Sequence, residues 1–172
     1  MLASAGVGLL SLPSMVVPAS SHADGDPAVP FYVLGGSGLP TPSTQLIDML
    51  QAVYFPSVAN FDGQPTFSNI DPQALTTPEQ FYPITGTDQE TLATSVSQGV
   101  QLLDNQIAPI LSAGNAVDVL GASQSAVIAS LEMEQLEQTD PTANASFVLL
   151  GDLMNPNGGI FERFAGLDLS SL

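Results

Sequence analysis

The sequence has almost no positive charge. Its 172 residues carry 17 acidic side chains and a single basic one, Arg163, so the formal net charge is −16 at pH 7. Binding to nucleic acid needs basic side chains on the phosphates, and docking on anionic lipid needs a basic patch. The composition therefore argues against both. The acids are scattered singly or in small groups, such as Glu132, Glu134 and Glu137, and we expect them to face solvent.

Cysteine is absent, which excludes disulfides, thiolate metal sites and a cysteine nucleophile. Histidine occurs once, at His22, and the acids show no EF-hand spacing. A complete G-x-G-x-x-G pattern is missing, and without lysine no P-loop can form. We therefore predict that the protein uses no metal and no cofactor, and that it binds neither nucleotides nor nucleic acid.

Charge is also absent from the first 23 residues, which are small and apolar. Residues 21–23, Ser-His-Ala, place small side chains at the −3 and −1 positions of a signal-peptide cleavage site, although the usual basic start is missing. The alternative is an apolar first strand or helix, interrupted by Pro13 and Pro18. We predict a leader or signal peptide over residues 1–23, one domain over residues 24–172, and a protein that is secreted or associated with the cell envelope.

What is present is an alternation of strand and helix patterns. Short apolar runs bounded by turn residues predict strands at Phe31–Leu34, Val117–Leu120 and Phe147–Leu150. Apolar side chains at helical spacing predict helices over residues 44–54, 88–111 and 126–138, the second with a capping box at Thr87 and Glu90. Residues 55–86 are rich in proline and predict loops, with residues 81–84 an edge strand or a covering loop. The alternation predicts an α/β fold with a mostly parallel sheet flanked by helices, and sites at the carboxyl ends of its strands.

One loop at such a strand end carries the chemistry. Residues 121–125, Gly-Ala-Ser-Gln-Ser, match the G-x-S-x-small pattern of the nucleophile elbow of α/β hydrolases. The pattern lifts the hydroxyl of Ser123 above the sheet on a strained turn. The residues two positions before and two positions after it pack closely and must be small, as Gly121 and Ser125 are. The alternative is an ordinary strand–helix turn in which Ser123 caps the helix. The strand before it and the amphipathic helix after it favour the elbow.

Two loops together predict a site for an oxyanion. The backbone amide of Gln124 begins the helix after Ser123, where the helix dipole favours negative charge. The glycine-rich loop over residues 35–38 follows an earlier strand and offers a second donor from Gly36 or Ser37.

Four segments resemble the PE-PPE domain: residues 31–38, 75–83, 121–126 and 151–164, the last with Asn-Pro-Asn-Gly-Gly followed by Glu-Arg-Phe. That family comprises secreted or envelope-associated serine α/β hydrolases of actinobacteria that act on acyl esters as esterases or lipases. The resemblance implies that Ser123 is the nucleophile of a Ser–Asp–His triad working through an acyl-enzyme. It implies an acyl ester or lipid as the substrate.

The sequence differs from the family pattern in the other two residues of the triad. In this fold the order along the chain is Ser, then Asp or Glu, then His, and no histidine or lysine follows Ser123. Asp152 lies where a triad acid is found in some hydrolases, although a loop-capping role beside Asn155 is the favoured interpretation. We expect a copy of the domain that is truncated at its C-terminus and impaired in hydrolysis. The alternative is a non-catalytic secreted or envelope interaction domain that retains the hydrolase scaffold.

Overall fold

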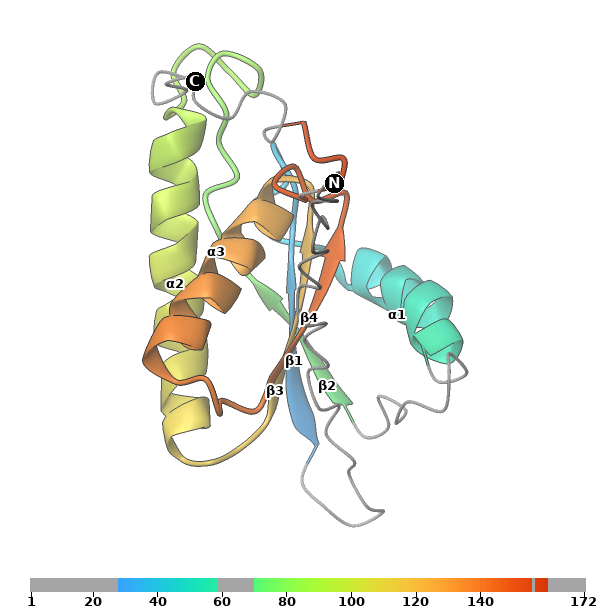
Figure 1. Cartoon of the computed structure of the whole chain (residues 1–172). Helices are drawn as coiled ribbons and strands as arrows, with labels where there is room; N and C mark the ends of the chain where they lie inside the picture. The colour runs from blue at the N-terminus through green and yellow to red at the C-terminus, as the bar shows by residue number, and fades with distance from the viewer. Residues whose placement is uncertain (1–27, 59–69, 156, 161–172) are drawn as a thin grey trace, which may run out of the picture.

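The structure is a computed structural model that describes residues 28–58, 70–155 and 157–160 (Figure 1). The predicted leader over residues 1–23 and the single arginine, Arg163, lie outside the described residues, so the leader stays a prediction. In the part of the chain that is described, no helix is long and apolar enough to cross a membrane.

Four six-residue strands form one sheet in which every pairing is parallel: β1 Val29–Leu34, β2 Ile70–Leu75, β3 Val117–Ala122 and β4 Ala145–Leu150. Their order across the sheet is β2-β1-β3-β4. The predicted α/β fold with a parallel sheet is confirmed. Because β1 and β3 are neighbours and run the same way, the loops that follow them leave the sheet side by side.

Helices cover both faces of this sheet. Figure 1 shows α1 on one face and α2 and α3 on the other, with bounds Thr44–Val58, Leu92–Ser112 and Gln124–Thr139. Alternate side chains of β1 divide between the two layers, as the two-residue period of a strand requires. Phe31 and Val33 pack in the cluster with α1, whereas Tyr32 and Leu34 pack in the larger cluster with α2 and α3.

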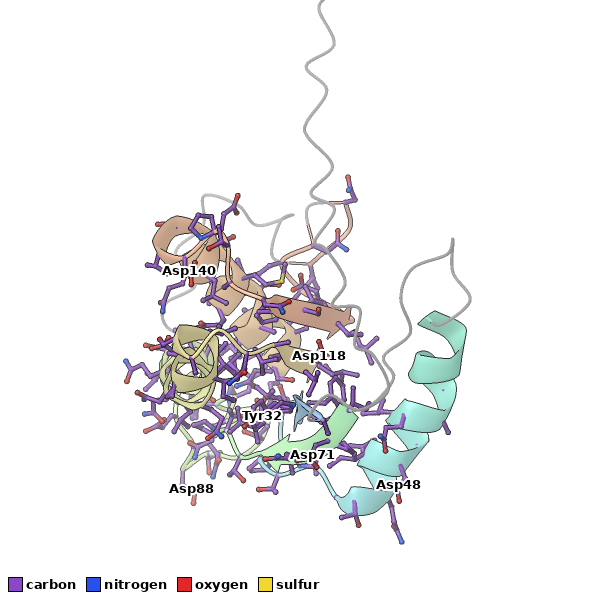
Figure 2. The ribbon with its side chains drawn as sticks, turned by 90° about the horizontal axis from the view of Figure 1, so that it is seen from below. Tyr32, Asp48, Asp71, Asp88, Asp118 and Asp140 are labelled. Atoms are coloured by element: carbon purple, nitrogen blue, oxygen red, sulfur yellow. The ribbon has the colours of Figure 1, made fainter. Side chains whose placement is uncertain are left out.

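The acidic side chains that Figure 2 labels on the helices and loops lie around the outside of the molecule. Asp48, Asp88 and Asp140 are exposed, whereas Tyr32 lies inside, between the sheet and α2. The Tyr32 hydroxyl accepts a hydrogen bond from Gln106 Nε2 of α2 at 2.8 Å. The described acids therefore lie largely at the surface, and the three buried exceptions are Glu79, Asp118 and Glu132.

Helix α2 begins four residues later than the sequence pattern predicts. Thr91 is its N-cap, and the side chain of Thr91 accepts a hydrogen bond from the amide of Thr94 at 3.3 Å. The predicted capping box at Thr87 is wrong, because the Glu90 amide donates instead to Gln80 Oε1 at 2.7 Å. A tertiary contact with the preceding loop thus occupies the donor on which the local motif depends.

Strand β2 was not expected, since Asp71 and Pro72 are typical of loops. It pairs with β1 along all six residues and lies at the edge of the described sheet. An edge strand tolerates proline because its backbone is paired on one side only. Residues 81–84 form no strand: the amide of Thr85 donates to Phe81 O at 2.9 Å and closes a turn. Of the two predicted alternatives for these residues, an edge strand and a covering loop, the loop is the one observed.

Three acids are buried among the described residues: Asp118 on β3, Glu79 in the loop before α2, and Glu132 on α3, the last contrary to the expectation of a solvated face. Burial, with the nearby charge of Asp104, raises the pKa of Glu132 to about 7, and neither of its oxygens has a hydrogen-bond partner among the described residues. Burial also raises the pKa of Glu79 to about 7 against the opposing effect of a hydrogen bond from Thr77. An acid with a raised folded-state pKa stabilises the fold fully below its unfolded pKa, and this stabilisation is lost as pH rises through the folded value.

Replacing Glu132 with glutamine should therefore stabilise the protein at pH 8 and have little effect at pH 5. A shift from 4.5 to about 7 corresponds to at most about 3 kcal/mol, and we expect about 1–2 kcal/mol because the buried amide also lacks partners. Thermal unfolding at both pH values measures this. Glu134→Gln removes the same charge from an exposed position of α3 and is the matched control. Equal gains for the two variants at pH 8 would contradict the assignment.

Candidate active site

Ser123 occupies a strained turn between β3 and α3. Its backbone angles are φ 59° and ψ −115°, in a region that glycine enters freely and other residues avoid. It stands at the N-cap position of α3, yet its side chain makes no capping hydrogen bond. The interpretation of Ser123 as an ordinary helix cap is therefore wrong. The residue is exposed, so its hydroxyl is accessible at the carboxyl end of β3.

The residues two positions before and two positions after Ser123, Gly121 and Ser125, are small because they pack against each other. A Cβ added at Gly121 would lie 2.3 Å from the backbone oxygen of Ser125. The buried Ser125 hydroxyl accepts from the amide of Ala122 at 2.7 Å and donates to the oxygen of Ala122 at 3.1 Å. Serine at the fifth position of the motif, where glycine is usual, therefore stabilises the turn through two hydrogen bonds to Ala122.

The glycine-rich loop after β1 lies directly against this turn, as the sequence predicts. A Cβ added at Gly36 would lie 3.2 Å from the oxygen of Ala122 and 3.4 Å from Cβ of Ser123. The hydroxyl of Ser37 donates to Oε1 of Gln124 at 2.8 Å. Residues 36, 37, 123 and 124 are thus brought together from two strand ends.

Backbone amides make the place where these two loops meet favourable for an anion. The amide of Gln124 is the first of α3, and the first four amides of a helix have no acceptor within it. The partial positive charge at the helix N-terminus falls beside Ser123. The arrangement can stabilise negative charge that develops on an oxygen attached to the carbon that the Ser123 oxygen attacks.

Residues 77–79, to which the sequence pattern gave no role in the site, support the glycine-rich loop. The amide of Gly38 donates to the backbone oxygen of Glu79 at 2.7 Å, and the amide of Thr77 donates to that of Pro40 at 3.1 Å. Glu79 itself has a positive φ of 51°. A buried acid in a left-handed conformation has no local sequence signal beyond the proline before it, so these contacts emerge only from the fold.

Asp152 follows β4, the neighbour of β3, and its carboxylate is committed to its own surroundings. Oδ1 accepts from the amide of Met154 at 2.9 Å, and Oδ2 accepts from the Ser130 hydroxyl of α3 at 3.0 Å. The hydrogen bond from Met154 is that of a loop-capping aspartate. The loop also lines an open polar hollow of about 380 Å³ with Asn155. These contacts favour the capping role, and none of them joins Asp152 to Ser123.

The strained backbone at Ser123 leads to a prediction about the stability of two variants. Glycine at this position should raise the unfolding temperature relative to alanine, because it adopts φ 59° without the clash of a Cβ. We expect a net gain of about 1 kcal/mol, the relief of strain being partly offset by the greater freedom of glycine in the unfolded chain. Thermal unfolding of Ser123→Gly and Ser123→Ala measures the difference, and an alanine variant at least as stable as the glycine variant would contradict it.

The parallel sheet with helices on both faces, and the turn at Ser123 beside the glycine-rich loop, define an α/β protein of the hydrolase-like type. The family model of the PE-PPE domain matches residues 68–172, and the chain belongs to that family. The resemblance inferred from the sequence motifs is thereby confirmed.

Curated proteins of Mycobacterium tuberculosis strain H37Rv match most of the chain. Esterase PE16 is 41% identical over 145 residues, which cover 81% of this chain and 26% of the relative. The uncharacterized PPE family protein PPE28 is 38% identical over 143 residues, 81% of this chain and 21% of the relative. The PE family protein PE3 is 36% identical over 145 residues, 81% of this chain and 29% of the relative. The chain thus spans about a quarter of the length of these relatives.

Proposed function

We propose that the chain carries the nucleophile and the oxyanion site of a serine ester hydrolase. Membership of the PE-PPE family and a relative named an esterase support esterase-type activity at the family level. The observation that carries the proposal for this chain is the exposed hydroxyl of Ser123, held on a strained turn against Gly36 and the first amide of α3.

The proposed reaction has two steps. The Ser123 oxygen attacks the carbonyl carbon of an acyl ester, and the alcohol leaves with a proton, which gives an acyl-enzyme. Water then attacks the same carbonyl and releases the carboxylic acid and free serine. In both steps the backbone amides of Gln124 and of Gly36 or Ser37 hold the oxyanion.

Each step also needs a base to take a proton from the attacking oxygen. No histidine follows Ser123, and lysine is absent from the 172 residues. We therefore assign the base to a group that these residues do not supply. Asp152 remains a candidate acid for the triad, although it would have to give up its present hydrogen bonds.

A second candidate function is a non-catalytic interaction domain that keeps the hydrolase scaffold. The observation that favours it is that the 172 residues hold no histidine after Ser123. Under either function we propose a secreted or envelope-associated protein. The proposed substrate of the hydrolase is an acyl ester, free or in a lipid. Nucleic acid is not among the proposed partners, since a net charge of −16 would repel it.

Binding of an alkylboronic acid separates the two functions without requiring turnover. Boron accepts the Ser123 oxygen to form a tetrahedral anion that mimics the reaction intermediate, and the serine proton passes to the buffer. We expect binding, followed by ¹¹B NMR at pH 8, to be at least about tenfold tighter in the wild type than in Ser123→Ala. Equal affinity of the two proteins would favour the non-catalytic domain.

A further inference from the structure

The side chain of Gln124 is fully buried at the start of α3 and links three separate segments. Its Nε2 donates to the Ser95 hydroxyl oxygen of α2 at 2.7 Å and to the backbone oxygen of Gln80 at 3.2 Å. Its Oε1 accepts from the hydroxyl of Ser37 at 2.8 Å. One amide group thus joins the loop after β1, the loop before α2, and α2 itself.

The chemistry of these partners fixes how the amide of Gln124 is oriented. The backbone oxygen of Gln80 can only accept, so Nε2 must face it, and Oε1 must face Ser37. The Ser37 hydroxyl then donates its proton inward to Gln124 and cannot donate it to an oxyanion at the same time. Ser37 therefore contributes to an oxyanion site through its backbone amide.

Ser95 of α2 accepts hydrogen bonds from both Gln124 and Gln80. It is fully buried on α2, and its oxygen accepts from Nε2 of Gln124 at 2.7 Å and from the amide of Gln80 at 2.9 Å. One turn further along α2, a Cβ added at Gly99 would lie 2.3 Å from Cδ1 of Ile128 of α3. Small residues at positions 95 and 99 lie on the same face of α2. They allow α2 to approach α3 closely enough for Ser95 to reach Gln124.

We propose that Ser95 is a positioning residue for the Ser123 site: through Gln124 it holds the loop of Gly36 and Ser37 against the turn. Its effect on catalysis rests on the proposed function, whereas the bracing of the loop does not. A glycine-rich loop has little to fix it locally, and a displacement of about 1 Å in an active site costs much of the rate. Loss of the Ser95 hydroxyl would leave the buried donor Gln124 Nε2 and the partly buried amide of Gln80 without this acceptor.

The test compares Ser95→Ala with Ser97→Ala, which removes the hydroxyl of an exposed serine on the same helix. Amide hydrogen exchange is followed at Gly38 and Leu39, whose amides are hydrogen-bonded in the folded loop. Ester hydrolysis in the presence of imidazole, after subtraction of the Ser123→Ala rate, gives kcat and KM. For Ser95→Ala we expect exchange at these amides to be about tenfold faster and kcat to fall about tenfold or more, with KM unchanged. Ser97→Ala should resemble the wild type in both.

Ser37→Ala keeps the proposal testable if Ser95→Ala does not fold, since it breaks the linkage at an exposed residue. It should give the same faster exchange and lower kcat. Unchanged exchange at Gly38 and Leu39 in a folded variant would overturn the proposal, as would a loss of kcat that only follows the loss of folded protein. If the wild type shows no hydrolysis that depends on Ser123, the proposed function fails, and hydrogen exchange alone decides whether Ser95 braces the loop.

Discussion

Gly121→Ala is expected to cost at least about 3 kcal/mol of folding free energy and to lower the unfolding temperature by about 10 °C. The added Cβ would lie 2.3 Å from the oxygen and 2.7 Å from the carbonyl carbon of Ser125, where real contacts are never so short. Both are backbone atoms in the first turn of α3 and cannot rotate away. Either the helix moves from the sheet or the turn at Ser123 opens. Circular dichroism melting and urea unfolding of the purified variant measure the loss.

Gly114→Ala is the control that separates a steric clash from backbone strain. Gly114 has a φ of +77°, and a Cβ added there would meet no atom within 4 Å. Alanine at this position should cost about 1 kcal/mol, from the left-handed backbone alone. A Gly121→Ala variant no less stable than Gly114→Ala would show that the turn is not packed as closely as described.

Ester hydrolysis by the 172-residue chain should be slow without added base and should rise when imidazole is supplied. General-base assistance contributes about 10²–10⁴ in rate, and the chain has no histidine after Ser123 to provide it. Free imidazole at high concentration replaces the missing group without its positioning, so we expect the part of the rate that depends on Ser123 to increase about tenfold or more. The measurement is release of p-nitrophenol from p-nitrophenyl butyrate against imidazole concentration.

The Ser123→Ala variant is required as the reference, because imidazole alone hydrolyses activated esters. The rate with wild-type protein minus the rate with Ser123→Ala is the quantity of interest. Fast hydrolysis without imidazole that disappears in Ser123→Ala would contradict the assignment of the base to a group outside these residues. Asp152→Asn would then be the next variant, since Asp152 follows the strand beside Ser123.

The parts of this fold that the sequence predicts are those with local causes. The runs at β1 and β3 are apolar and bounded by turn residues, and glycines mark the two loops that meet at Ser123. Parallel strands place their carboxyl ends together, so the meeting of the loops follows from the fold class. Strand β2 was missed because its stability comes from pairing with β1, which overrides the loop propensities of Asp71 and Pro72.

The contacts that support the site join residues far apart in the sequence, so no local pattern predicts them. Gln124 is separated from its partners Ser95, Gln80 and Ser37 by 29, 44 and 87 positions. The motif indicates the amide of Gln124 but says nothing about its side chain. Glu132 looks like part of an exposed acidic run, and its burial reflects how α3 packs on α2 rather than any feature of its neighbours in the chain.

If the oxygen of Ser123 forms the bond to the acyl group, the acyl-enzyme can be trapped on that residue. The chain is incubated with an isotopically labelled butyryl ester and imidazole, quenched in acid and digested, and the acylated residue is identified by mass spectrometry. We expect label on Ser123, not on the neighbouring Ser125, and none on residues 121–125 of Ser123→Ala. Label spread over many serines, or hydrolysis of equal rate in Ser123→Ala with no acyl group on Ser123, would contradict it.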